Sequence, residues 1–300
     1  MVNRASYMEL LADGRLAERI EMANGNIYNC NLCPHRCGID RRWELGICKA
    51  EDRAILSSYG PHLGEEKVLV GTRGSGTIFF GYCNMRCIFC QNYELSFYGR
   101  GTPISNQHLA EVMLKLQNYH GCHNINLVTP THFVPNILEA IYIAAQKGLN
   151  LPIVYNCGGY ERVETLKLLD GVVDIYMPDF KYNSSERGSR YSQVKDYPRK
   201  AKLALMEMDR QVGGLEIDEK GIAYRGLLIR HLMLPDGLED TKEILDFIGE
   251  KLFPGALVNL MDQYYPSHRA HEHRELSRRL RSSEYGEAYR YARELGLRLA

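Results

Sequence analysis

The sequence predicts an α/β fold built on a parallel sheet, and three features of the chain lead to this prediction. Six short runs rich in apolar residues recur along it, at residues 77–82, 124–129, 151–155, 172–177, 226–233 and 256–261. Segments with helical periodicity lie between these runs, and strands that alternate with helices pair in parallel through crossover connections. Several runs are apolar almost throughout, as expected for strands covered on both faces. A barrel and an open doubly wound sheet both remain open.

The chain begins before this alternation does. We predict a short polar helix at residues 6–22, followed by a segment with four cysteines between Cys30 and Cys48. The regular pattern starts only after the glycine-rich residues 71–76. The predicted parts are therefore a helix with a cysteine-rich metal-binding module (1–70), a core (71–265) and a C-terminal helical segment (266–300).

The helices between the strands are predicted from apolar residues spaced three or four apart, the spacing that places them on one helical face. Five segments show this pattern, at residues 109–116, 137–145, 163–169, 201–208 and 244–252. In a sheet with such crossovers, chemistry gathers at the carboxyl ends of the strands. The polar residues that follow each strand are therefore the first candidates for a functional site.

Composition limits the function classes. The 300 residues include 37 basic and 37 acidic side chains, so no overall charge favours a nucleic acid or an anionic membrane. No apolar run approaches the roughly 18 residues that a membrane span needs, and residues 1–20 lack the apolar core of a signal peptide. We expect a cytoplasmic protein with no nucleic-acid or membrane partner.

Three cysteines carry the strongest chemical signal. Cys83, Cys87 and Cys90 follow the first predicted strand with the spacing C-x3-C-x2-C. Thiolates are the usual protein ligands of iron–sulfur clusters, and three of them suit a cubic cluster that is one ligand short. An open iron can bind a small molecule. The alternatives are a zinc knuckle with a distant fourth ligand, three unconnected thiols, and a disulfide with one thiol left over.

This triplet, with the aromatic Phe89 before its last cysteine, resembles the signature of the radical S-adenosylmethionine (SAM) superfamily. The resemblance implies a partial (β/α)6 barrel whose three thiolates hold a [4Fe-4S] cluster, with SAM chelated by the fourth iron. In that superfamily, one electron splits SAM to a 5'-deoxyadenosyl radical that abstracts hydrogen. A reductant such as flavodoxin or ferredoxin is implied as a partner.

Within the superfamily, the chain is similar to the pyruvate formate-lyase activating enzyme group and to a branch of its homologues. The phrases that carry this resemblance are Gly-Ser-Gly-Thr-Ile-Phe-Phe80, Asn124-Ile-Asn-Leu-Val-Thr-Pro-Thr-His132, Asp174-Ile-Tyr-Met-Pro-Asp179 and Ile229-Arg-His-Leu-Met-Leu-Pro235. It implies activation of a glycyl radical enzyme, a protein substrate. A small-molecule radical reaction or a peptide modification is the alternative, because the group's Gly-Gly-Glu element after the second strand is replaced here by Thr129, Thr131 and His132.

The resemblance also implies cofactor contacts at the strand ends. Thr131 stands where the group binds the amino group of SAM, and Asn156 stands where an acidic or amide residue contacts SAM. Asp179 and Lys181 resemble an Asp-x-Lys element that contacts the cofactor, and Arg230 resembles an arginine directed toward its ribose or carboxylate. His132 is either a proton acceptor or a structural histidine.

The cysteine-rich module supplies a second set of thiols. Cys30, Cys33, Cys37 and Cys48 lie within nineteen residues, which provides enough ligands for one closed metal site. Tetrahedral zinc with a folding role and a second iron–sulfur cluster both fit four thiolates.

Two functions from different classes are therefore expected. The first is a radical SAM enzyme that cleaves SAM reductively. The second is an iron–sulfur electron carrier or metal-binding regulator that never cleaves SAM. The number of strand ends with polar groups favours the enzyme, because together they form a mouth of the kind that small molecules occupy.

Overall fold

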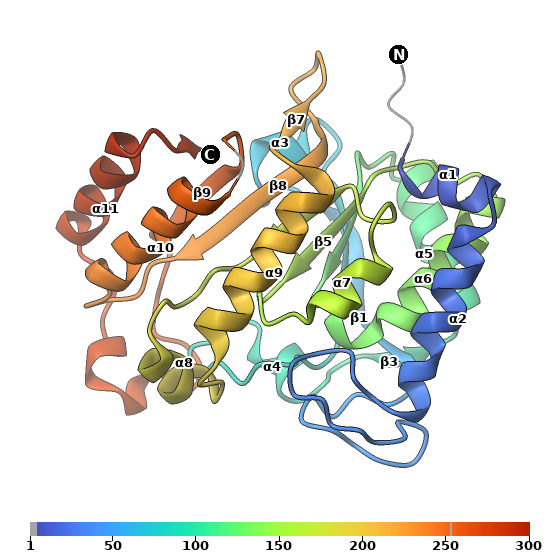
Figure 1. Cartoon of the computed structure of the whole chain (residues 1–300), viewed down its shortest axis with the longest axis horizontal. Coiled ribbons are helices and arrows are strands. Elements are labelled where there is room, and N and C mark those ends of the chain that lie inside the picture. The colour runs from blue at the N-terminus through green and yellow to red at the C-terminus, as the bar shows by residue number, and fades with distance from the viewer. Residues whose placement is uncertain (1–4, 253) are drawn as a thin grey trace.

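The computed structural model describes residues 5–252 and 254–300, and the strands within them form one sheet (Figure 1). The sheet runs in the order β10-β9-β8-β6-β5-β4-β2-β1-β3, with β7 paired to β8. Its strands are β1 (Ala54–His62), β2 (Ser75–Phe80), β3 (Thr102–Ile104), β4 (Ile125–Val128), β5 (Ile153–Cys157), β6 (Ile175–Pro178), β7 (Glu216–Ile217), β8 (Ala223–Leu232), β9 (Leu257–Met261) and β10 (Arg298–Leu299).

All six predicted strands are present, as β2, β4, β5, β6, β8 and β9, and each pairs in parallel with the next. They lie side by side in chain order, whereas a doubly wound sheet reverses its order at a switch point. The order decides against the doubly wound alternative. The row does not close on itself, because β10 continues it at one edge and β1 and β3 pair antiparallel at the other.

The helices are α1 (Tyr7–Ala12), α2 (Arg15–Tyr28), α3 (Lys67–Val70), α4 (Tyr93–Ser96), α5 (Asn106–Asn118), α6 (Val134–Gln146), α7 (Val163–Leu168), α8 (Ser185–Ser192), α9 (Tyr197–Val212), α10 (Leu238–Lys251) and α11 (Ser282–Glu294), with short 3-10 turns η1 (Thr131–Phe133), η2 (Ala270–Glu272) and η3 (Arg274–Leu276). The single helix expected at residues 6–22 is two helices. Gly14 separates them with φ of 85°, a left-handed conformation that glycine adopts without steric cost. None of the described helices is long and apolar enough to cross a membrane.

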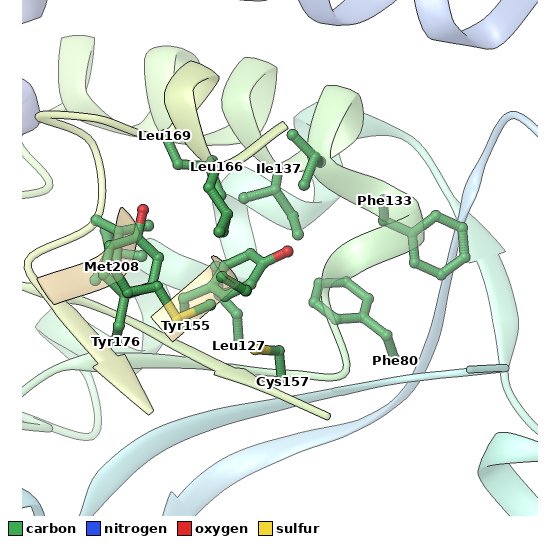
Figure 2. Close-up of a cluster of buried hydrophobic side chains, with 14 of the residues drawn as sticks. Phe80, Leu127, Phe133, Ile137, Tyr155, Cys157, Leu166, Leu169, Tyr176 and Met208 are labelled. Carbon is green, nitrogen blue, oxygen red and sulfur yellow. The ribbon is translucent and has the colours of Figure 1, made fainter. Parts of the chain in front are cut away.

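The main core lies between the sheet and the helices that cover one of its faces. Figure 2 shows Leu127, Tyr155 and Tyr176 from three neighbouring strands packed against Ile137, Leu166 and Met208 from α6, α7 and α9. Successive residues of a strand point to opposite faces. Val154, Ile175, Met177 and Leu228 therefore form a second, smaller cluster on the other face, where Leu69 of α3 joins them. We call this the inner face.

The sequence prediction missed four strands, the short β3 and β7 within the predicted core and β1 and β10 outside it. β1 lies within residues 1–70, which were predicted to precede the core, and β10 lies within the C-terminal segment. The polar residues of β1, with Ser57, Ser58 and Gly60 in its centre, do not show the apolar pattern of a buried strand. Both strands extend the parallel row at its edges, so the sheet draws on all three predicted parts of the chain.

The cysteine-rich loops are fixed to the sheet by Arg41, which is 1% exposed. Its guanidinium donates to the carbonyl of His132 at 2.6 Å, to that of Ala50 at 3.4 Å, and to that of Glu51. His132 follows β4, so one buried side chain joins residues 41–51 to the end of a central strand. Figure 1 shows these loops in blue at the bottom of the view, at the lower end of α2 and beside α4.

His231 joins β8 to the helix that follows it. Its Nδ1 donates to the carbonyl of Phe180 at 2.6 Å, and its Nε2 accepts from the hydroxyl of Thr241 at 2.9 Å. Burial lowers the pKa of His231 to about 4. The imidazole is therefore neutral in the folded protein at neutral pH, and it serves as a structural link.

Substituting Arg41 by Met should lower the free energy of unfolding by about 3 kcal/mol, because three carbonyl groups would lose a buried donor. Urea denaturation measures the loss. Arg42→Met is the matched control, since Arg42 is exposed and pairs with Asp40 on the surface, where such a pair contributes roughly 1 kcal/mol or less. Equal losses in both variants would contradict the assigned role of Arg41.

His231 predicts a pH dependence of stability. The unfolded imidazole binds a proton below its ordinary pKa of 6.5, whereas the folded one does so only below about 4. Stability should therefore fall as the pH drops from 6.5 toward 4, by up to roughly 3 kcal/mol from this residue. His231→Gln should flatten that part of the stability curve, while the exposed His271→Gln should leave it unchanged. Parallel curves for the wild type and His231→Gln would rule the effect out.

Candidate functional site

The cysteine triplet lies directly beyond the carboxyl end of β2. The strand ends at Phe80, and Tyr82 turns the chain out of the sheet with φ of 67°. Positive φ is uncommon for a residue with a bulky side chain and is retained where the surroundings enforce it, often at functional sites. The Tyr82 N–H donates to the carbonyl of Leu95 at 2.8 Å, which closes the loop that carries Cys83, Cys87 and Cys90.

Each thiol of the triplet has a polar neighbour. Cys83 Sγ accepts from the N–H of Met85 at 3.4 Å, Cys87 Sγ accepts from the Ser192 hydroxyl at 2.9 Å, and Cys90 Sγ lies 3.2 Å from the Ser96 hydroxyl. Burial raises the pKa of Cys83 above its usual range, and the Cys87 and Cys90 thiols add to the rise. Burial likewise raises the pKa of Cys87, to about 11. The three sulfurs therefore influence one another, and of the three residues Cys87 is buried while Cys83 and Cys90 are half-buried.

Hydrogen bonds from three other segments hold this loop. His132 donates from Nε2 to the carbonyl of Gly81 at 2.9 Å, and His35 donates from Nε2 to the carbonyl of Asn84 at 2.8 Å. The side chain of Asn84 donates in turn to the carbonyl of Tyr160 at 2.7 Å. The loop is thus tied to the ends of β4 and β5 and to the front cysteine segment.

The two glycines after β5 make close packing with this loop possible. A Cβ on Gly158 would lie 2.9 Å from the sulfur of Met85, and one on Gly159 would lie 2.2 Å from the carbonyl oxygen of Asp179. Protein atoms therefore occupy the space that these glycines leave. They allow close packing between β5, β6 and the triplet loop.

Asp179 and Lys181 form an ion pair at the end of β6, with Lys181 Nζ 2.5 Å from Asp179 Oδ2. Their side chains meet although β6 ends at Pro178, before both residues. Burial opposes the charge of Lys181, but the Asp179 carboxylate and the nearby Cys87 thiol outweigh it and raise the pKa of the ammonium above its usual range. The pair therefore places a charged lysine next to the cysteine triplet.

Arg230 lies on the inner face and already has two carboxylate partners. It donates to Glu66 at 2.8 and 2.7 Å and also to Glu65, both from the segment before α3. Asn259 Nδ2 donates to Glu66 at 2.7 Å as well. Burial opposes the charge on Glu66, but Arg230 outweighs it and keeps the pKa of Glu66 below its usual range. These hydrogen bonds use Nε and one terminal nitrogen of Arg230, and its predicted contact with SAM stays a prediction.

Thr131 is also occupied by a protein partner. Its hydroxyl donates to Glu161 at 2.7 Å, and the hydroxyl of Tyr155 donates to the same carboxyl group at 3.1 Å. Glu161 is 1% exposed, and burial raises its pKa to about 7. This acid was missed by the sequence analysis. The one feature of the sequence that could have indicated Glu161 as a site residue is its position four residues beyond β5, in the same loop as Gly158 and Gly159.

Asn156 and Phe89 take different places. Asn156 is opposite Met177 in the ladder between β5 and β6, so it lies on the inner face, near the end of the strands. The backbone of Asp179 forms an isolated parallel bridge with that of Arg230, just beyond the end of β6. Asn156, Asp179 and Arg230 therefore lie along one edge of the inner face. Phe89 is buried between the rings of Tyr182 and Tyr264, with centroids 6.3 and 6.1 Å away. Its ring supports the loop from the side of β9.

Two other candidates are structural. His132 is 2% exposed, and burial lowers its pKa to about 3, so it is a neutral donor to Gly81. This decides against a proton acceptor that titrates near neutral pH. Cys157 alternates with Asn156 and lies in the core cluster of Figure 2, on the face away from the inner one.

The front cysteines Cys30, Cys33, Cys37 and Cys48 are all free thiols, and three of them are buried. Burial raises the pKa of Cys33, and Cys48 and Cys30 add to the rise, which places their thiols near one another. In residues 5–252 and 254–300, no group of three or more His, Cys, Asp or Glu side chains is already arranged to hold a metal ion. Both cysteine sets therefore remain predicted metal sites.

The triplet nevertheless fits an iron–sulfur cluster by the chemistry of its donors. Three soft sulfur ligands stand on one loop at the carboxyl edge of a parallel sheet, and thiolates are the ligands that such clusters take. Ser192 and the Met85 N–H supply hydrogen bonds to the sulfurs, contacts of the kind that tune cluster potentials. All nine cysteines are free, so the disulfide alternative is wrong for this structure.

Comparisons with known proteins agree with this arrangement. The sequence is 34% identical to the uncharacterized protein MJ0674 of Methanocaldococcus jannaschii over 97% of this chain and 82% of that protein. It is 25% identical to MJ0808 of the same organism over 55% of this chain and 52% of that protein.

Among solved structures, the fold is similar to a radical SAM methyltransferase from Sphaerobacter thermophilus, with a TM-score of 0.54 and 13% identity, over 75% of this chain and 65% of that one. At that identity the likeness concerns the fold alone. The family model of the Radical SAM superfamily matches residues 77–248, a span that begins in β2 and includes the three cysteines beyond it. The chain belongs to the radical SAM superfamily.

Proposed function

We propose that this protein is a radical SAM enzyme in which Cys83, Cys87 and Cys90 hold a [4Fe-4S] cluster with one iron open to SAM. The observation that supports this most is the position of the triplet loop, at the carboxyl edge of the sheet and beside the Asp179–Lys181 pair. When bound, the cluster and SAM together supply a one-electron cleavage that yields a 5'-deoxyadenosyl radical for hydrogen abstraction.

The chain's own residues would bind and orient the cofactor. Asp179 can accept hydrogen bonds from ribose hydroxyls or an ammonium, and Lys181 can neutralise part of the negative charge that three thiolates bring. Asn156 offers an amide on the same inner face. The Thr131 hydroxyl donates to Glu161 and could still accept from the ammonium of SAM, and Arg230 would offer its second terminal nitrogen beside the pairs with Glu65 and Glu66.

Two substrate classes remain within this proposal. The similarity to glycyl radical activases makes a glycine of a partner enzyme one target. A small molecule or a peptide is the other. The changed Gly-Gly-Glu element, with the Thr131 hydroxyl turned to Glu161, favours a cofactor contact unlike that of the activases. A fold shared with a methyltransferase does not transfer that protein's reaction.

The front cysteines complete the proposed cofactor set. Cys30, Cys33, Cys37 and Cys48 would hold either zinc, which would stabilise the fold, or a second iron–sulfur cluster. Their loops contact the triplet loop through His35, so either metal would support the main site. A protein reductant, such as flavodoxin or ferredoxin, would deliver the electron.

Replacing any one of Cys83, Cys87 or Cys90 by Ala should abolish formation of 5'-deoxyadenosine, because the cluster loses a corner ligand. The assay is anaerobic reconstitution with iron and sulfide, reduction by dithionite, and chromatography of the products after addition of SAM. Iron content should fall in the same variants. Cys122→Ala is the control, since Cys122 is a buried cysteine that lies outside both sets.

The outcome also separates the two function classes. Wild-type protein that holds an intact, reduced cluster and binds SAM without forming 5'-deoxyadenosine would be an electron carrier or regulator.

Replacing Cys30 by Ala should remove the front metal and lower the yield of soluble protein, while the triplet keeps its iron. Elemental analysis of zinc and iron per chain, before and after reconstitution, measures both effects. Unchanged metal content in Cys30→Ala would show that the front thiols hold no metal.

A further inference from the structure

Two buried hydroxyl groups form a chain that ends on the thiol of Cys87. The hydroxyl of Ser192 donates to Cys87 Sγ at 2.9 Å, and the hydroxyl of Tyr182 lies 2.9 Å from that of Ser192. Ser192 and Tyr182 are both 0% exposed. Because both side chains are withdrawn from solvent, each hydroxyl must find its hydrogen-bond partner within the protein. We call Tyr182 and Ser192 the hydroxyl pair.

The backbone holds Ser192 against this one cysteine. Ser192 is the last residue of α8. Ile88, on one side of Cys87, donates its N–H to the carbonyl of Tyr191 at 2.8 Å. Arg86, on the other side, donates its N–H to the carbonyl of Ser192 at 3.4 Å. The end of the helix therefore grips the triplet loop on both sides of Cys87, and the Ser192 hydroxyl is fixed at the sulfur between these two contacts.

The ring of Tyr182 is held by other aromatic rings. Its centroid lies 5.4 Å from that of Tyr197 and 6.3 Å from that of Phe89, both in edge-to-face arrangements. Burial raises the pKa of Tyr182 well above its usual range, and the nearby Cys87 thiol adds to the rise. Tyr182 therefore keeps its proton and has one hydrogen to donate.

The number of protons sets the direction of this chain when Cys87 binds iron. A thiolate carries no proton and only accepts hydrogen bonds, and each hydroxyl has one hydrogen to donate. Ser192 must use its hydrogen on the Cys87 sulfur, so its oxygen accepts from Tyr182. Hydrogen bonds aligned in this way polarise one another, which strengthens the bond that reaches the charged sulfur.

The other two cysteines of the triplet have weaker contacts of this kind. Cys90 Sγ lies 3.2 Å from the hydroxyl of Ser96, and Cys83 Sγ accepts from the N–H of Met85 at 3.4 Å. The contact at Cys87 is the shortest of the three. In the part of the chain that the structure describes, it is also the one that a second hydroxyl supports.

We propose that the hydroxyl pair raises the reduction potential of the cluster proposed for the triplet, with Ser192 acting on Cys87 and Tyr182 acting through Ser192. This inference rests on the proposed function. Reduction adds one electron from an external reductant, and the hydrogen bond to Cys87 stabilises the added negative charge. No covalent bond forms or breaks, and both hydroxyl protons stay on their oxygens. Ser192 and Tyr182 are positioning residues, and they make an unfavourable electron transfer easier.

A redox titration followed by electron paramagnetic resonance, on reconstituted protein without SAM, measures this potential. Ser192→Ala should lower the equilibrium constant for reduction about tenfold, which equals about 59 mV for one electron. Tyr182→Phe keeps the ring and removes only the hydroxyl, so it should lower that constant less, by about twofold. Both variants should keep the iron content of the wild type.

The double variant separates a chain of hydroxyls from two independent effects. Because Tyr182 acts through Ser192, the variant with both Ser192→Ala and Tyr182→Phe should have the potential of Ser192→Ala alone. A further fall in the double variant, equal to the fall in Tyr182→Phe alone, would overturn the chain.

Ser189→Ala and Tyr191→Phe are the matched controls. Ser189 is exposed on the same helix as Ser192. Tyr191 is also buried, but its hydroxyl donates to Glu275 at 2.6 Å and not to the hydroxyl pair. Both controls should keep the potential of the wild type. Equal potentials in Ser192→Ala and Ser189→Ala would overturn the proposal.

The test remains decisive if Ser192→Ala loses iron. The bond from Ser192 to Cys87 is still present in Tyr182→Phe, so a lowered potential in that variant would support the proposal and an unchanged one would overturn it. Failure of the proposed function is a separate result. It appears as a wild-type triplet without iron, or as a reduced wild-type cluster that does not cleave SAM, whereas a cluster that cleaves SAM at a potential independent of Ser192 contradicts this inference alone.

Discussion

The structure depends on how the triplet loop is held at the end of β2. His132 bonds to Gly81, and Leu95 bonds to Tyr82. Asn84 bonds to both His35 and Tyr160. These four partners come from four different parts of the chain. The loop itself buries Met85, Ile88 and Phe89 in the main core. Hydrogen bonds from elements that lie far apart in the chain add to this packing, and together they fix the backbone that carries the three cysteines.

The charged groups near this loop are also held by contacts with other parts of the protein. A buried charge is costly unless it is paired, and each buried charge near the site has a partner of opposite sign or several hydrogen bonds. Lys181 pairs with Asp179, Arg230 pairs with Glu65 and Glu66, and Glu161 accepts from Thr131 and Tyr155. These pairs make the strand ends rigid.

The sequence was sufficient for the elements whose signal is local. Each central strand was predicted within a few residues because its apolar run is short and is bounded by polar residues. β1 was missed because serines and a glycine interrupt it, and the break at Gly14 was missed because helical periodicity continues across it.

The contacts that were missed join distant parts of the chain. Arg230 and Glu66 are 164 positions apart, and His35 and Asn84 are 49 apart. No pattern within a short window predicts such pairs. The need for a partner was nevertheless evident from the sequence, since an arginine within an apolar strand is rarely left unpaired. The pairing of Arg230 with Glu65 and Glu66 needed the three-dimensional arrangement.

The central claim is that the triplet holds a cubic cluster with one iron free to bind SAM. Mössbauer spectroscopy of protein reconstituted with iron-57, recorded with and without SAM, tests it most directly. We predict that SAM shifts the signal of a single iron site away from the other sites of the same cluster, and that this shift is lost in Cys87→Ala. A cluster whose iron sites all remain unchanged when SAM is added would contradict the account.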